Sequence, residues 1–427
     1  MTTLGFVHLY KMEYLRTKFT SIKIMKFGII KERKNPPDRR VVFSPGKLQE
    51  FKNIFSEASI KVESSSIRVF SDEAYEKAGL EVVNDVADCD VLIGVKEVPI
   101  AALVPNKKYF FFSHTIKKQP YNRKLLQAVL EKNIELYDHE TIAKENGTRL
   151  IGFGRYAGIV GAYNGFRAFG LKYETFVLPK ATMLDDQQAL IDTLRTIELP
   201  NIKILLTGHG KVALGAKEML DAMQLQKVSV EAYLTQTFNE PVYCLIDALD
   251  YNKRRDGKRL NRRDFYNNPA DYVSDFMRFA KVTDYFIAGH FFGDGSPYLF
   301  TREDAKSSAF NIKLVADISC DIDGPVAATI RSSTIADPIY GYNPETGSEI
   351  DFKDDNAIVV MAVDNLPCEL PKDASEGFGE LFLEHVIPAF FNNDKDGVLA
   401  RAKMTENGKL TERFQYLQAY LEGKEYV

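Results

Sequence analysis

The stretch LLTGHGKVALGAKEML, residues 205–220, joins an apolar run to a segment of helical spacing through a glycine-rich turn. Gly208, Gly210 and Ala213 form a G-x-G-x-x-A pattern within it. The first glycine permits a tight turn, the second lets a pyrophosphate approach the backbone, and the small third residue allows close helix–strand packing. The helix start adds N–H donors and a positive dipole. The stretch therefore predicts a dinucleotide-binding strand–turn–helix, to which we also assign Gly215.

The acid that should bind the adenosine ribose is not decided by the sequence. Glu231 lies at about the usual spacing of ~20 residues beyond the turn, but its segment, VSVEAYLTQTF, does not resemble a strand that ends in an acid. Asp247 ends a clearer strand but is distant in sequence. The basic segment KRRDGKRLNRR, residues 253–263, is expected to be a solvated loop; near the ribose it would favour a 2′-phosphate. Both NAD and NADP therefore remain open as coenzymes.

Strand-like and helix-like segments alternate along the chain. Helices are expected at 45–54, with Ser44 as N-cap and Pro45 at the first helical position, and at 122–133 and 211–223. Strands are expected at 25–30, 89–95, 107–113, 134–138, 201–208, 241–247, 283–289, 312–319 and 357–364. Such alternation is typical of parallel sheets covered by helices. We predict an α/β fold of two Rossmann-like, doubly wound parallel-sheet domains with a cleft between them.

A segment rich in glycine, alanine and aromatic residues, 151–173, separates the two strand–helix series. We expect it to form one long helix that links two domains. Segments 374–391 and 410–421 have helical apolar spacing, and we expect them to pack back onto the first domain.

The predicted substrate domain is therefore discontinuous and comprises residues 25–170 together with 366–427. The predicted dinucleotide-binding domain comprises residues 171–365. Residues 1–24 do not resemble a signal peptide, because they have no long apolar core and no small-residue cleavage site. We interpret them as an extension before a domain that starts at Met25.

The composition is that of an ordinary globular protein with two or three domains. The 427 residues are 45% hydrophobic and 27% charged, and the net charge is −4. No overall basic character indicates nucleic acid or an anionic membrane as a partner, and no apolar run approaches the ~20 residues that span a bilayer. The four cysteines are scattered without a zinc or disulfide pattern, which suggests reduced thiols in a cytoplasmic protein. We expect a small-molecule substrate and no metal; a homo-oligomer is compatible with the sequence.

Charged side chains and one histidine gather in four short motifs before the glycine-rich segment. Ligands bind at the carboxyl ends of strands in open α/β sheets, so these side chains could form one acid–base site. A lone histidine or a single Lys-Glu pair is more often structural, but several together before a dinucleotide turn favour chemistry. The motifs are DRRVVFSP with Arg40, DVLIGVKEVP with Lys96 and Glu97, FFFSHTIKKQ with His114 and Lys117, and ELYDHET with Glu140.

Four segments resemble the superfamily of alanine dehydrogenase and lysine-forming saccharopine dehydrogenase. The resemblance is greatest to the lysine–ketoglutarate reductase domain of the bifunctional aminoadipic semialdehyde synthases, and it extends in family order over residues 25–410. The FSHTIK and DNLP…LP…AS motifs are specific, whereas the glycine turn is not. The segments are FFSHTIKKQ, TGHGKVALGAKE, KLVADISCDIDGP with TIADP downstream, and VDNLPCELPKDASEGFG.

The resemblance implies a role for each candidate residue. Lys96 and His114 match the family's catalytic lysine and histidine, and Glu97 and Glu140 match the acidic neighbours that tune them. Arg40 and Lys117 match positions that bind substrate carboxylates. Asp317 and Asp321 match acidic positions beside the nicotinamide and the reaction centre, Asp321 as a catalytic residue, and Asp364 and Asn365 match the pair that lines the coenzyme cleft.

The implied reaction is the reversible, nicotinamide-dependent oxidation of saccharopine to lysine and 2-oxoglutarate. Lys96 would accept the proton of the secondary amine before hydride transfer. His114 would serve as acid–base in hydrolysis of the imine, because histidine titrates near neutrality. Two alternatives stay open: an amino-acid dehydrogenase like alanine dehydrogenase, and a dinucleotide-binding regulator without catalysis. The physiological direction is also open.

Overall fold

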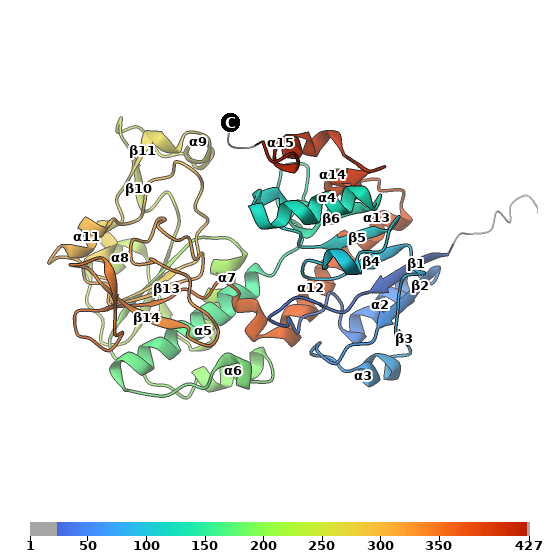
Figure 1. The fold of residues 1–427 in the computed structure, drawn as a ribbon. Helices are drawn as coiled ribbons and strands as arrows, with labels where there is room; N and C mark the ends of the chain where they lie inside the picture. Colours follow the sequence, from blue (N-terminus) through green and yellow to red (C-terminus); the bar gives the residue numbers. More distant parts are fainter. Residues whose placement is uncertain (1–23, 425–427) are drawn as a thin grey trace, which may run out of the picture. The chain divides into compact units, whose positions relative to one another are not determined.

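A computed structural model describes residues 24–424, so almost all of the predicted 1–24 extension lies outside the described residues. The chain divides into two compact units (Figure 1). Unit 1 comprises residues up to Ile151 together with those from Ser375 onward, and unit 2 comprises Gly152–Ala374. No helix within 24–424 is both long and apolar enough to cross a membrane.

Unit 1 is built on a six-stranded parallel sheet in the order β3-β2-β1-β4-β5-β6. The order turns back at β1, which pairs with β2 on one side and β4 on the other, as in doubly wound folds. The strands are β1 (Met25–Ile29), β2 (Ala58–Glu63), β3 (Glu81–Val83), β4 (Val91–Ile93), β5 (Lys108–Phe111) and β6 (Glu135–Asp138).

Helices cover the unit 1 sheet, and those at 45–54 and 123–131 lie where the sequence predicts them. Residues 410–421, expected to be helical throughout, instead form a 3₁₀ helix, Glu412–Leu417, and a short final helix. In α2 (Pro45–Ile54), the Ser44 side chain accepts a hydrogen bond from the Lys47 N–H, and Pro45 occupies the first turn; both features were predicted. The other helices wholly within this unit are α3 (Asp72–Lys77), α4 (Arg123–Glu131), α13 (Ile387–Phe391), α14 (Val398–Ala402) and α15 (Gln418–Leu421). Helix α12 (Pro371–His385) begins at the end of unit 2 and continues into unit 1.

The aromatic strand β5 lies in the interior of unit 1, as its composition predicts. Tyr109, Phe110 and Phe111 are almost completely buried. Phe110 stacks on Tyr137 of β6 with ring centroids 4.5 Å apart and meets the edge of Phe382 in α12. The contact with Phe382 shows the C-terminal segment packed on the first sheet.

Unit 2 has an eight-stranded sheet in the order β15-β14-β16-β13-β12-β7-β9-β8. The run from β16 to β8 is parallel. The strands are β7 (Lys203–Thr207), β8 (Gln226–Lys227), β9 (Val242–Ile246), β12 (Tyr285–Ala288), β13 (Leu314–Asp317), β14 (Ile339–Asn343), β15 (Ser348–Ile350) and β16 (Ile358–Met361).

The other edge of this sheet departs from the predicted all-parallel arrangement. β14 is antiparallel to both β15 and β16, so the unit 2 sheet is mixed. The cause is chain length: only short connections separate β14, β15 and β16, whereas a parallel pair needs a crossover of a dozen or more residues. The α/β class is confirmed, and the wholly parallel sheet is corrected for this unit.

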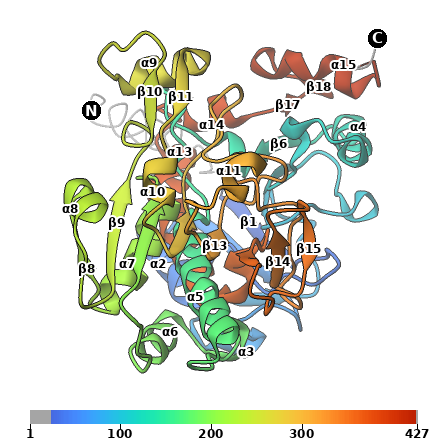
Figure 2. The same cartoon turned by 90° about the vertical axis from the view of Figure 1, so that its left-hand side faces the viewer.

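The long helix α5 (Gly154–Tyr173) belongs to unit 2, although it was predicted to fall mostly in the first domain. It crosses α7 (Lys211–Ala222) at very close range. A Cβ added at Gly158 would lie 1.9 Å from the Val212 carbonyl oxygen, and one at Gly215 would lie 2.0 Å from that of Arg155. Only glycine permits this crossing, which packs α5 into unit 2. Figure 2 shows α5 in front of β13, with which it also packs.

A small insert follows β9 in unit 2. It contains the antiparallel pair β10 (Asn252–Arg254) and β11 (Tyr272–Ser274), with the short helix α9 (Arg262–Asn267) between them (Figure 1). The predicted basic loop is therefore partly structured. The remaining helices of unit 2 are α6 (Gln187–Leu194), α8 (Val230–Thr235), α10 (Met277–Ala280) and α11 (Arg302–Lys306).

Candidate functional site

The glycine turn between β7 and α7 has the backbone that its pattern predicts. Gly208 adopts a φ of 101°, and a Cβ there would lie 2.6 Å from the Gly289 carbonyl oxygen. Gly210 is the N-cap residue of α7, and a Cβ added to it would meet no atom within 4 Å. The turn is thus tightly packed at Gly208 and open at Gly210. This combination fits a pyrophosphate bound over the first turn of α7.

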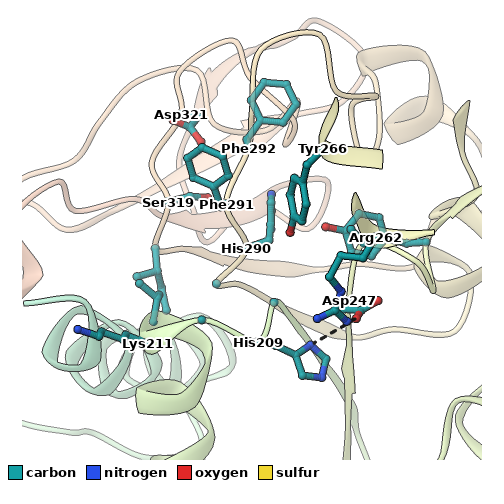
Figure 3. A pocket seen from close by; sticks show the side chains of 17 residues that line it. His209, Lys211, Asp247, Arg262, Tyr266, His290, Phe291, Phe292, Ser319 and Asp321 are labelled. Atoms are coloured by element: carbon teal, nitrogen blue, oxygen red, sulfur yellow. Dashed lines mark hydrogen bonds and ion pairs between the residues drawn. The ribbon is translucent and has the colours of Figure 1, made fainter. Parts of the chain in front are cut away.

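A cavity of about 580 Å³ opens at this turn, within unit 2 (Figure 3). Its size suits a part of a dinucleotide or a small substrate. Residues from the ends of β7, β9, β12 and β13 line it together with α9. They are Gly208, His209, Gly210, Lys211, Val212, Asp247, Ala248, Tyr251, Arg262, Tyr266, Gly289, His290, Phe291, Phe292, Ile318, Ser319 and Asp321.

Asp247, and not Glu231, lies at the cavity. Asp247 directly follows β9, and β9 is the strand that pairs with β7. Glu231 lies in the first turn of α8 and is exposed. The Asp247 Oδ2 accepts a hydrogen bond from Arg262 Nη2 and lies 4.0 Å from His209 Nδ1, while Oδ1 accepts from the Leu249 N–H. Of the two acids between which the sequence could not decide, Asp247 is therefore the one beside the turn, and it is already paired with a cation.

The predicted acids after β13 take different positions. Asp317 is fully buried, and its carboxylate accepts hydrogen bonds from Ser319 Oγ, the Cys320 N–H and Thr329 Oγ1. Its oxygens are thus engaged within the protein. Asp321 lines the cavity, and burial, with the charge of Asp317 adding to it, raises the pKa of its carboxyl.

Four other predicted coenzyme residues do not line this cavity. Ala213 is completely buried beneath the turn, where a Cβ at Gly289 would lie 3.1 Å from its Cα. Gly215 has the packing role described for the crossing of α7 with α5. Asp364 is exposed, and Asn365 precedes a short 3₁₀ helix, Leu366–Glu369.

His290 also borders the cavity and was not predicted. It follows Gly289 after β12, and its Nδ1 lies 2.8 Å from Thr207 Oγ1. Burial lowers the pKa of its imidazole to about 4, against the opposing charge of Asp317, so the ring is neutral at physiological pH. A histidine after a buried strand carries no motif that would have identified it.

In unit 1, the predicted catalytic lysine follows β4, where Glu32 holds its backbone. The two carboxylate oxygens of Glu32 accept hydrogen bonds from the N–H groups of Val95 and Lys96, at 2.7 and 2.8 Å. Burial raises the pKa of Glu32 to about 7, although both hydrogen bonds oppose the shift. Glu32 was not predicted, and it fixes the backbone position from which the Lys96 side chain extends.

His114 and Glu97 form a hydrogen-bonded pair across neighbouring strand ends. His114 Nδ1 lies 2.6 Å from Glu97 Oε1, and Glu97 Oε2 accepts from Lys34 Nζ at 3.0 Å. Burial opposes ionisation of Glu97, but the bonds from His114 and Lys34 outweigh it and lower its pKa to about 2. His114 has a φ of 54° and its ring stacks on Phe112. A carboxylate thus orients the imidazole through one nitrogen, the arrangement that acid–base catalysis needs.

Glu140 gathers cations beside this pair. Its Oε1 lies 3.5 Å from Lys117 Nζ and 2.6 Å from Arg149 Nη2. Burial raises the pKa of Glu140, but the charges of Arg149 and Lys117 outweigh it, so the pKa is lowered overall. Arg149 was not predicted. It follows Glu140 in a loop, and its sequence neighbourhood, NGTRLIG, carries no recognisable signal.

Arg40 pairs with a neighbouring acid in unit 1. It is almost fully buried and forms a bidentate ion pair with Asp38, at 3.0 Å for Nε–Oδ1 and 2.6 Å for Nη2–Oδ2. The charges of Arg40 and Lys96 both act on the Asp38 carboxyl. The structure therefore brings together two groups: Lys96 with Glu32, Asp38 and Arg40, and His114 with Glu97, Glu140 and Lys117.

Comparisons with known proteins show what the chain is similar to. Residues 28–160 match the family model "Alanine dehydrogenase/PNT, N-terminal domain". An alpha-aminoadipic semialdehyde synthase of Arabidopsis thaliana is 26% identical over 435 residues, covering 91% of this chain and 41% of the relative. An NAD⁺-dependent, L-lysine-forming saccharopine dehydrogenase of Yarrowia lipolytica is 20% identical over 346 residues, which cover 76% of this chain and 82% of the relative. The chain spans less than half the length of the semialdehyde synthases it matches.

A solved structure of L-alanine dehydrogenase shares the fold, with a TM-score of 0.60 and 17% identity, covering 93% of this chain and all of the other. The fold, the family model and the relatives together support the superfamily of alanine dehydrogenase and saccharopine dehydrogenase. The sequence motifs resemble those of aminoadipic semialdehyde synthases and saccharopine dehydrogenases. Both kinds of protein are among the relatives found, so this resemblance is confirmed.

Proposed function

We propose that this protein catalyses the reversible oxidation of the CH–NH group of saccharopine, yielding lysine and 2-oxoglutarate, with NAD(P) as coenzyme. Unit 1 provides the acid–base and substrate-binding side chains, and unit 2 binds the dinucleotide. The observation that carries the proposal is the group around His114: an imidazole oriented by Glu97, beside a carboxylate that holds both Lys117 and Arg149.

The cations explain the choice of substrate. Saccharopine carries three carboxylates, whereas alanine carries one. Lys117 and Arg149 have about half of their side-chain surface exposed and are held near each other by Glu140, so they can turn donors toward a substrate carboxylate. Arg40, paired with Asp38 close to Lys96, is a further candidate. A substrate with one carboxylate would leave much of this positive charge unused.

The two proton-transferring groups have different tasks. Lys96 accepts the proton of the secondary amine, and the hold of Glu32 on its backbone keeps the side chain in place. His114 moves protons to and from water and the leaving amine during imine hydrolysis, with Glu97 fixing the ring through Nδ1 so that Nε2 faces the reaction. Such groups typically contribute ~10²–10⁴ in rate.

The nicotinamide coenzyme supplies the hydride acceptor, and no metal is needed. Gly210 leaves room for the pyrophosphate, and the first turn of α7 provides N–H donors and the positive end of the helix dipole. Asp321 lies at the same cavity with a raised pKa, where it can hold or release a proton.

An activity screen tests the proposal. The full chain is incubated with saccharopine, with lysine plus 2-oxoglutarate, and with alanine, each with NAD(H) and with NADP(H), and nicotinamide absorbance is followed. We expect turnover of saccharopine in one direction and of lysine plus 2-oxoglutarate in the other. Turnover of alanine alone would favour the alanine dehydrogenase alternative, and coenzyme binding without any turnover would favour the regulator.

A further inference from the structure

Helix α9 of the basic insert presents two side chains to the cavity at the glycine turn. Arg262 and Tyr266 are four residues apart, hence on one face of the helix, and both line the cavity (Figure 3). The helix is held in place by its own insert, since Asp264 accepts hydrogen bonds from Tyr272 Oη and Arg254 and Asn261 caps its first turn. These two side chains are therefore fixed features of the cavity wall.

The position of Arg262 is defined by Asp247. Asp247 follows the strand next to β7, at the place where Rossmann folds bind the adenosine ribose. Its side chain is only 16% exposed and accepts a hydrogen bond from Arg262 Nη2, whereas the Arg262 side chain is 57% exposed. A carboxylate alone at this corner would accept ribose hydroxyls and repel a phosphate. Here the carboxylate is paired with a guanidinium, and the more exposed member of the pair is the positive one.

A histidine also lies at this corner. His209, in the turn itself, has Nδ1 4.0 Å from Asp247 Oδ2 and is 47% exposed. A guanidinium presents several N–H donors in a fixed plane and matches the oxygens of a phosphate better than any other side chain. Tyr266, 54% exposed, offers an aromatic face one turn along α9 and lines the same cavity.

We propose that α9 and Asp247 form a subsite for adenosine 2′-phosphate, in which Arg262 binds the phosphate and Tyr266 stacks on the adenine. This inference rests on the proposed function and extends it: it makes the 2′-phosphorylated dinucleotide, NADP(H), the preferred coenzyme. Arg262 is then the residue that determines coenzyme choice. Asp247 is the positioning residue that holds it.

The test is a set of binding titrations with the full chain. NADPH and NADH are titrated by fluorescence, and 2′,5′-ADP and 5′-ADP by calorimetry, against the unmodified chain, Arg262→Ala, Arg262→Lys and Arg263→Ala. Arg263 is the matched control, because it is the next residue of α9, is exposed and does not line the cavity. We expect NADPH and 2′,5′-ADP to bind more tightly than their unphosphorylated counterparts.

Arg262→Ala should weaken the binding of NADPH about 10- to 100-fold, the loss usual for a charge-assisted hydrogen bond. The affinity for NADH should change by less than about threefold. Arg262→Lys should recover part of the loss, and Arg263→Ala should bind both coenzymes as the unmodified chain does. Tyr266→Ala should weaken the binding of both coenzymes equally, and Tyr266→Phe should bind both coenzymes as the unmodified chain does.

The failures of the two proposals are distinguishable. If the unmodified chain binds NADH as tightly as NADPH, or if Arg262→Ala weakens both to the same extent, the subsite is refuted while dinucleotide binding stands. If neither dinucleotide binds the unmodified chain, the proposed function fails and the subsite fails with it.

Discussion

The strand ends of unit 1 and the glycine turn of unit 2 are prepared for their ligands in opposite ways. In unit 1, charged side chains are held by partners: Glu97 by His114 and Lys34, and Glu140 by Lys117 and Arg149. In unit 2, the turn has no side chain at two positions: Gly208 allows close packing against Gly289, and Gly210 leaves open space over the backbone. Under the proposed function, the proton-transferring groups have charges fixed by neighbouring side chains, whereas the pyrophosphate would bind to bare backbone.

The glycines of unit 2 should separate binding from folding most sharply. Gly210→Asp adds a carboxylate where no atom lies within 4 Å, so the chain should fold normally and lose measurable NAD(P)H binding through charge repulsion. NADH and NADPH fluorescence titration measures the loss, and circular dichroism checks the fold. Unchanged affinity would mean that the turn has only a structural role.

Gly215→Ala is the matched change in the same helix, with the opposite expectation. Its Cβ would lie 2.0 Å from the Arg155 carbonyl oxygen, so α5 and α7 must separate. Overpacking of this kind typically costs about 1–3 kcal/mol or more of unfolding free energy. Urea denaturation measures it, and a variant as stable as the unmodified chain would contradict the close crossing.

Removing one partner of a buried ion pair of unit 1 should cost more unfolding free energy than removing one partner of an exposed pair. Asp38→Asn removes the carboxylate that pairs with the buried Arg40 and should cost about 3 kcal/mol of unfolding free energy. Asp88→Asn, which removes the exposed partner of Lys26 and Lys61, is the control and should cost less than about 1 kcal/mol. Equal costs in urea unfolding would show that burial does not govern these pairs.

Removing the charge that orients His114 should have a moderate effect on rate. Glu97→Gln keeps the shape of the side chain but loses the carboxylate 2.6 Å from Nδ1. We expect kcat with saccharopine to fall about tenfold, within the range of a lost charge-assisted hydrogen bond. Steady-state kinetics measures kcat, and an unchanged value would show that Glu97 does not support the imidazole.

Glu97→Gln should also have a smaller effect, on the pH dependence of the unfolding free energy. The pKa of Glu97 is lowered to about 2 in the folded chain from an ordinary value of 4.5, so its contribution to stability is complete above 4.5. The contribution is lost as the pH falls from 4.5 towards 2. The difference in unfolding free energy between the unmodified chain and Glu97→Gln should therefore shrink over this window. Urea unfolding at several pH values measures it, and a constant difference would refute the lowered pKa.

Local patterns allowed the sequence to predict the turn, the strand β5 and the cap of α2. Each depends on neighbours in the chain: glycines set the turn, aromatic residues fill a buried strand, and Ser44 caps the helix that Pro45 begins. The antiparallel edge was missed, because no strand was expected over 339–350, where β14 and β15 form.

In the candidate sites, too, residues that depend on contacts distant in sequence could not be predicted. The sequence could not place Asp247 rather than Glu231 beside the turn, because that depends on β9, and not β8, pairing with β7. Arg149 was missed because only the folded loop brings it to Glu140. Glu32 acts through backbone N–H groups and leaves no pattern in the sequence.

The central claim is that Lys96 and His114 transfer protons at different stages of saccharopine oxidation. Single-turnover, stopped-flow measurement with ordinary and deuterated saccharopine, following both nicotinamide reduction and lysine release, tests it most directly. For Lys96→Met we expect nicotinamide reduction itself to slow ~10²–10⁴-fold, because the amine keeps its proton. For His114→Gln we expect nicotinamide reduction at nearly the rate of the unmodified chain, followed by lysine release slowed to a similar degree. Wild-type rates for both steps in both variants would contradict the account and place the chemistry elsewhere.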